Sequence, residues 1–190
     1  MLEFGLNLRE LACGKSSRAF SCPRLAGNVT LYGNVNIEQD KTVPLKFGFW
    51  SAPPGSVPVK LDSFYLTFYD MSTHTKKSGD MAGTHSVSTA DHEAYFLAYD
   101  TTVSTEGSTD HKAVMTGTEE GTAPWLASEL LPEEKRQAVT FLFVNKSEVK
   151  INVTVWGGSG NRNVRFSGRS IFHWNRCTHT QSERCQANHR

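Results

Sequence analysis

One stretch of the chain, residues 63–70, constrains the fold more than any other. Its side chains alternate between two kinds, which are Phe64, Leu66 and Phe68 at one set of positions and Tyr65, Thr67 and Tyr69 at the other. Successive side chains of a β-strand point to opposite faces, so this pattern predicts a strand with one apolar and one amphipathic face. The residues after Asp70 are typical of turns and predict a polar loop that extends to about Ser88.

Further segments with the composition of strands follow one another along the chain. They cover residues 28–37, 45–49, 85–88, 94–104, 111–117, 138–145, 148–156 and 163–167. A short helix is expected within 127–138, because Pro132 is followed by Glu133 and Glu134 and then by two basic residues, an order that suits the helix dipole. Strands at this spacing predict an all-β fold, a two-layer antiparallel β-sandwich that is jelly-roll-like and has about eight strands.

The 190 residues fit one domain with two tails. We expect a poorly ordered N-terminal segment at 1–27, the β-sandwich domain at 28–172 and a basic C-terminal tail at 173–190. The net charge of +1 gives no general attraction to nucleic acid, and the basic end lacks the interleaved aromatic side chains that bind single strands. Because no run of about 18 apolar residues occurs, we expect no membrane span.

Cysteines and glycosylation motifs predict an extracellular or cell-surface protein. Three asparagines, Asn28, Asn145 and Asn152, begin N-glycosylation motifs. Four cysteines lie outside the strand-rich middle and are candidates for disulfides in any of three pairings: Cys13, Cys22, Cys177 and Cys185. Charged residues interrupt the first ten positions, so these do not have the pattern of a signal peptide, and we expect that the native N-terminus lies upstream. A cytoplasmic location is the alternative.

Three segments together resemble a known domain. They are Phe-Tyr-Leu-Thr-Phe-Tyr-Asp at 64–70, Ala-Val-Thr-Phe-Leu-Phe-Val-Asn at 138–145 and Gly-Gly-Ser-Gly-Asn-Arg-Asn at 157–163. In this order they resemble an uncharacterised extracellular β-sandwich domain of dinoflagellate-type and related algal proteins, over roughly residues 28–170. The chain departs from that pattern at Ser72, where a second Asp is usual, and at Val164, where an aromatic residue is usual. The resemblance implies a fold and an extracellular setting but no reaction.

Oxygen-bearing side chains around the end of the 63–70 strand are candidates for a calcium site. Calcium takes six to eight oxygen ligands from carboxylates, carbonyls and hydroxyls. Asp70 and Ser72 stand two positions apart, and Asp80 follows in the predicted loop, so the three are candidate metal ligands. The competing interpretation is that they are ordinary turn-forming residues.

Exposed aromatic rings are the second candidate for a binding site. Flat amphipathic side chains that suit a glycan or a protein partner are Trp50, Tyr65, Tyr69, Tyr95 and Tyr99, although these can equally belong to the core or be isolated surface residues. No Gly-x-Ser-x-Gly or His-Glu-x-x-His motif occurs, and no catalytic residue is assigned. The sequence therefore favours a non-catalytic extracellular or cell-surface module with a structural or interaction role. The alternatives are a calcium-assisted carbohydrate-binding domain and a jelly-roll hydrolase with paired carboxylates.

Overall fold

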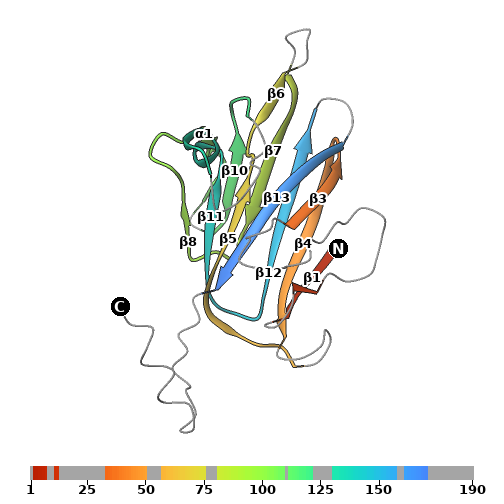
Figure 1. Cartoon of the computed structure of the whole chain (residues 1–190), viewed down its shortest axis with the longest axis vertical. Coiled ribbons are helices and arrows are strands. Elements are labelled where there is room, and N and C mark those ends of the chain that lie inside the picture. The colour runs from red at the N-terminus through yellow and green to blue at the C-terminus, as the bar shows by residue number, and fades with distance from the viewer. Residues whose placement is uncertain are drawn as a thin grey trace.

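Two facing β-sheets make up the protein (Figure 1). The computed structural model describes residues 2–7, 11–12, 33–50, 57–75, 81–109, 111–121, 130–157 and 161–170. The larger sheet contains β1 (Leu2–Asn7), β2 (Leu11–Ala12), β4 (Lys41–Trp50), β6 (Thr73–Thr75), β7 (Met81–Thr89), β9 (Val103–Ser104), β10 (Ala113–Gly117) and β12 (Glu148–Trp156). The smaller sheet contains β3 (Gly33–Glu38), β5 (Leu61–Tyr69), β8 (Ala94–Phe96), β11 (Val139–Lys146) and β13 (Asn161–Ser170).

Eight of these strands follow the order of a jelly roll. The larger sheet contains the order β4-β12-β7-β10, and the smaller contains β3-β13-β5-β11. Each strand therefore pairs with its counterpart from the other half of the chain, as in a long hairpin that is rolled into two sheets. This confirms the predicted all-β, two-layer, jelly-roll-like sandwich. The described residues form more than about eight strands, because β1, β2, β6, β8 and β9 are added at the margins, and β1 is parallel to β4.

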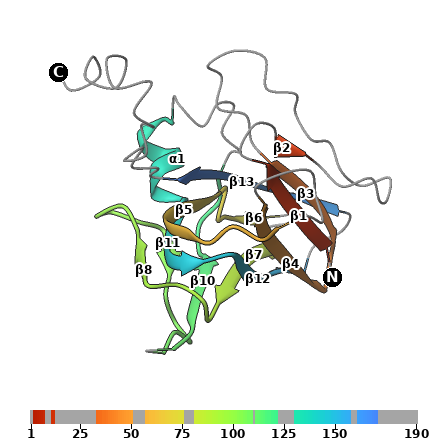
Figure 2. The ribbon, with the colours of Figure 1, turned by 90° about the horizontal axis from the view of Figure 1, so that it is seen from below.

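The two sheets face each other in the view along the strands (Figure 2). Aromatic side chains are prominent in the buried core between them. Phe64, Leu66 and Phe68 of β5 are all buried, which confirms the predicted apolar face of this strand. The Phe64 ring stacks on Phe143 with centroids 5.0 Å apart and meets Phe49 edge-on at 4.6 Å. Such offset and edge-to-face contacts add to the free energy gained by burying the rings.

The predicted polar loop from Asp70 to about Ser88 is wrong, whereas the strand predicted at 85–88 is confirmed as part of β7. Most of its described residues belong to β6 and β7, and β7 pairs with β12 on one side and with β10 on the other. A strand in this position needs apolar side chains on its inner face only, and β7 supplies Val87 there together with His85. Its outer face carries Thr84, Ser86 and Ser88, whose hydroxyls gave the segment the composition of a loop.

Two further boundaries differ from those expected. The segment 94–104 was expected to form one strand, and the structure divides it into β8 in the smaller sheet and β9 in the larger. The chain must cross between the sheets here, so a single strand cannot span the segment. The N-terminal segment 1–27 was placed outside the sandwich, whereas its residues 2–7 pair with β4 as β1.

The helix α1 (Pro132–Arg136) lies at the end of the sandwich where β5 and β10 stop (Figure 1). Pro132 occupies its first turn as predicted, and a Glu134 carboxylate oxygen accepts the Leu131 N–H at 2.7 Å. The carbonyl of Gln137, just after the helix, accepts the Met71 N–H at 2.8 Å. Among the described residues no helix is long and apolar enough to cross a membrane.

Candidate functional site

Asp70 stands at the crossover from β5 in the smaller sheet to β6 in the larger. Its φ of 57° lies in the left-handed region, which Asp tolerates better than most residues, and only 6% of its surface is exposed. The Ser72 hydroxyl donates to Asp70 Oδ1 at 2.7 Å. Gly117 leaves room for this crossover, because a Cβ at that position would lie 2.5 Å from the Met71 carbonyl oxygen.

His85, on the inner face of β7, fixes the main chain of the same crossover. Its Nδ1 lies 2.8 Å from the carbonyl oxygen of Asp70, so Nδ1 carries the proton and donates it. Burial lowers the pKa of His85 below the ordinary value of 6.5; the carbonyl and carboxylate of Asp70 act in the opposite direction, and the positive charge of Arg162 acts in the same direction as burial. The neutral imidazole is therefore the form that suits this position.

The structure brings together two of the three predicted metal ligands, Asp70 and Ser72. Asp80 lies outside the described residues. Over the described ranges, no group of three or more His, Cys, Asp or Glu side chains is placed to hold a metal ion. The hydrogen bonds of Asp70 and Ser72 join parts of the crossover to one another, so their observed role is to hold the chain between the sheets. Calcium at Asp70, Ser72 and Asp80 stays a prediction.

The predicted modification sites fall in different parts of the chain. Asn145 and Asn152 have exposed side chains, the first at the turn between β11 and β12 and the second on the outer face of β12. Asn28 and the four candidate disulfide cysteines lie outside the described residues: Cys13, Cys22, Cys177 and Cys185. Glycosylation and disulfide formation therefore stay predictions, and both described sequons offer an accessible asparagine.

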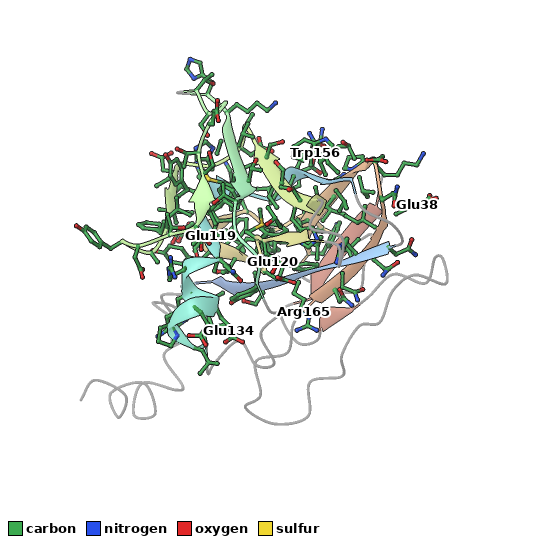
Figure 3. All side chains as sticks on the ribbon, turned by 90° about the horizontal axis from the view of Figure 1, so that it is seen from above. Glu38, Glu119, Glu120, Glu134, Trp156 and Arg165 are labelled. Carbon is green, nitrogen blue, oxygen red and sulfur yellow. The ribbon has the colours of Figure 1, made fainter. Side chains whose placement is uncertain are left out.

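Carboxylates surround α1, as Figure 3 shows for Glu119, Glu120 and Glu134. Arg136 binds Asp100 at 3.2 Å and Glu119 at 3.8 Å, which joins the helix to the preceding loops. The buried acidic side chains among the described residues are Asp70 and Glu134, and each accepts a hydrogen bond from its own loop or helix. Both are thus used in the structure, and the paired carboxylates of a hydrolase stay a prediction.

Two aromatic rings meet on the outer face of the smaller sheet. Tyr65 on β5 and Phe96 on β8 have ring centroids 6.0 Å apart, although β11 lies between their strands. On β11, Leu142 is the register partner of Tyr65 and Thr140 is the register partner of Phe96. The two rings therefore meet above the strand that carries Leu142 and Thr140. Phe96 is 50% exposed and Val144, further along β11, is 39% exposed. We call the set Tyr65, Phe96, Leu142 and Val144 the aromatic patch.

Hydroxyl groups and a guanidinium group flank the aromatic patch. Thr67 and Thr140 share a hydrogen bond of 2.9 Å beside the rings. Arg169 of β13 is exposed and pairs in register with Tyr65. Figure 3 shows Arg165, on the same face of β13, and Trp156, at the end of β12, on opposite sides of the sandwich. The patch therefore combines apolar rings, hydroxyls and positive charge on the side away from the larger sheet.

The outer face of the larger sheet has a different character. One Ser or Thr from each of five adjacent strands stands in a single row across it: Thr42, Thr154, Ser86, Thr116 and Ser104. Thr42 and Thr154 share a hydrogen bond of 2.9 Å, and Thr116 donates to Ser86 at 3.3 Å. These four hydroxyls bind one another in pairs, as cross-strand pairs commonly do in exposed sheets, and Ser104 Oγ accepts the Glu106 N–H.

The five aromatic residues that the sequence singled out are not brought together. Tyr65 belongs to the aromatic patch, whereas Tyr69 is buried and hydrogen-bonded to Ser167 at 2.7 Å. Tyr95 faces away from the patch, toward His92, and Tyr99 is fully exposed in the loop after β8. Trp50 is half-buried at the end of β4. Sequence reasoning missed Phe96, since the segment 94–104 has no alternation that would separate an outward Phe from a core Phe.

Comparison with models of protein families and with curated proteins finds no match to this chain. The resemblance to an algal extracellular domain therefore stays a prediction.

Proposed function

We propose that this protein is a non-catalytic binding module, extracellular or at the cell surface, and that it binds a glycan through the aromatic patch. The observation that carries the proposal is the contact of the Tyr65 and Phe96 rings across β11 on an outer sheet face, with Phe96 half exposed. A ring that stays exposed to water adds little to the stability of the core. Clusters of exposed apolar side chains mark interaction sites.

The chemistry of the surroundings supports a glycan. A pyranose has apolar C–H faces, which stack on aromatic rings, and a rim of hydroxyls, which need hydrogen-bonding partners. The patch supplies the rings, and Thr67 and Thr140 supply hydroxyls directly beside them. The extracellular setting draws support from the exposed asparagines of two glycosylation motifs, Asn145 and Asn152.

A glycan array, followed by calorimetry with any glycan that the array retains, tests this proposal. Phe96→Ala removes one ring of the pair and should weaken binding about tenfold or more. Tyr99→Ala is the matched control, because it removes an exposed aromatic side chain outside the patch. Both variants should keep the melting temperature of the wild type within a few degrees. Retention of no glycan, or equal affinity of Phe96→Ala and wild type, would show that the proposal is wrong.

A further inference from the structure

Beside the aromatic patch, the outer face of the smaller sheet carries positive charge, and the outward acid Glu38 of β3 pairs with Asn161, at the opposite end of β13 from Arg169. Over the described residues, the outward positions of β5, β11 and β13 include Arg165 and Arg169 and no Asp or Glu. Arg169 forms no ion pair with any described residue. A cation that lies beside an apolar patch and has no ion-pair partner among the described residues is available to a ligand that carries negative charge.

Register places this charge in line with the rings. Arg169, Tyr65 and Leu142 are direct neighbours on three adjacent strands. Adjacent strands lie about 4.8 Å apart, which is close to the length of one pyranose unit in a polysaccharide. A glycan that runs across the strands therefore sets one sugar on Tyr65 while its neighbour reaches the Arg169 guanidinium.

We propose that the aromatic patch selects glycans that contain uronic acids, and that Arg169 recognises their carboxylate groups. This inference rests on the proposed function. A carboxylate attached to the sugar ring extends from its rim, and Arg169 is the register neighbour of Tyr65 on the adjacent strand. The planar guanidinium binds carboxylates with two parallel hydrogen bonds, an interaction that is both strong and directional. An acidic protein segment would meet the charge but would offer no sugar faces to the rings.

The test uses the full chain with oligogalacturonate and with its methyl ester, which has the same sugars without the charge. Calorimetry should show about tenfold tighter binding of the acid form, and the preference should disappear in Arg169→Gln. Arg169→Lys keeps the charge but cannot form two parallel hydrogen bonds to a carboxylate. Its preference for the acid form should therefore lie between that of wild type and that of Arg169→Gln. Lys150→Gln is the matched control, since it removes the same charge from the outer face of the larger sheet and should bind as wild type does.

The outcomes separate this inference from the proposed function. If the acid and its methyl ester bind equally well and Phe96→Ala weakens both, the glycan site stands and carboxylate recognition is overturned. If Arg169→Gln and Lys150→Gln lose the same affinity, general charge attraction explains the result and the role of Arg169 is overturned. Equally tight binding of poly-glutamate would overturn the choice of a glycan as the partner. Failure of every glycan to bind overturns both proposals.

Discussion

Asp70 combines a left-handed backbone, a buried carboxylate and hydrogen bonds at both its side chain and its carbonyl. Ser72 fixes the side chain and His85 fixes the main chain, so the crossover between the sheets is held from two directions. Each of these bonds is made in a buried environment, where leaving a polar group without a partner is expensive. Single substitutions here should therefore act on stability.

Ser72→Ala should lower the free energy of unfolding by about 1–3 kcal/mol, because it removes the hydroxyl that donates to the buried Asp70 carboxylate. Urea unfolding followed by fluorescence measures this change. Ser88→Ala removes a hydroxyl from the outer face of β7 and should stay within about 0.5 kcal/mol of wild type. Equal stability of the two variants would contradict the role assigned to Ser72.

His85 should make stability depend on pH. Because burial lowers its pKa in the folded state, the unfolded chain binds a proton on His85 more readily than the folded protein does. Stability should therefore fall as the pH drops below about 6.5, and the fall should continue until the pH reaches the lower pKa of the folded state. Above pH 7 the residue is neutral in both states and contributes no slope.

Melting temperatures between pH 7.5 and 5 measure this dependence in wild type and in His85→Asn, whose amide keeps an N–H donor near the Asp70 carbonyl. The variant should show a shallower decline in acid. His111→Asn replaces an exposed histidine and should leave the decline unchanged. The same decline in wild type and His85→Asn would mean that another group titrates.

At the scale of elements, β7 begins with a close approach to its neighbour. Gly83 has φ of 153°, and a Cβ there would lie 2.9 Å from the carbonyl oxygens of Trp156 and Gly157. The first residues of β7 thus pass directly beside the end of β12, where the two strands leave their pairing. Only glycine allows both the backbone angle and this contact.

Gly83→Ala should therefore destabilise the protein by about 1–3 kcal/mol, through backbone strain and collision with main-chain oxygens. Chemical unfolding with a comparison of midpoints measures the effect. Gly168→Ala in β13 is the control, because a Cβ there meets its nearest neighbours at an ordinary 3.8 Å and should change stability by no more than about 0.5 kcal/mol. A larger effect at Gly168 than at Gly83 would contradict this account.

Elements differ in how well the sequence predicts them. Strands β4, β5 and β12 are recognisable because core-facing apolar residues alternate with outward residues of another kind, and β11 because it is a run of mostly apolar residues. β7 is recognised only over 85–88, because hydroxyl side chains form its outer face and a histidine occupies its inner face. Backbone pairing with β10 and β12, which no local pattern reports, decides its conformation.

The sequence predicts only part of the candidate site, because most of the site depends on how distant strands pair. Alternation in β5 assigned Tyr65 to the face away from the core, and the structure places it there. Phe96 reaches Tyr65 only because β8 pairs with β11, a contact between segments more than 40 positions apart. Arg169 joins them through the pairing of β13 with β5. The sequence thus identifies one member of the patch, and tertiary pairing supplies the others.

At the scale of the whole molecule, the strands that come last in the chain lie inside the sheets. β12 lies between β4 and β7, and β13 lies between β3 and β5. Asn163 of β13 accepts hydrogen bonds from Asn34 and Asn36 of β3, which are 129 and 127 positions away. Such distant contacts make folding slow, because the entropy of closing long loops must be overcome first.

Ending the chain after Gly157 should consequently abolish cooperative folding rather than weaken it by a few kcal/mol. Without β13, the strands β3 and β5 have no partner between them, and Val164 and Phe166 leave the core. Circular dichroism during a thermal melt detects the loss of a cooperative transition. A chain that ends at Ser170 keeps β13 and lacks only the later residues, so it is the control. It shows whether the effect comes from the loss of β13 or from the loss of residues 171–190. A cooperative melt of the shorter chain would contradict this prediction.

The interior position of β13 also has a consequence for biosynthesis. A ribosome makes this strand after all the other strands of the described part, so neither the pair β3 and β13 nor the pair β5 and β13 can form before residues 161–170 have emerged. We expect the sandwich to stay unfolded until β13 has been synthesised. A secretion channel accepts chains in that unfolded state, so the strand order that delays folding is compatible with the extracellular location that we propose.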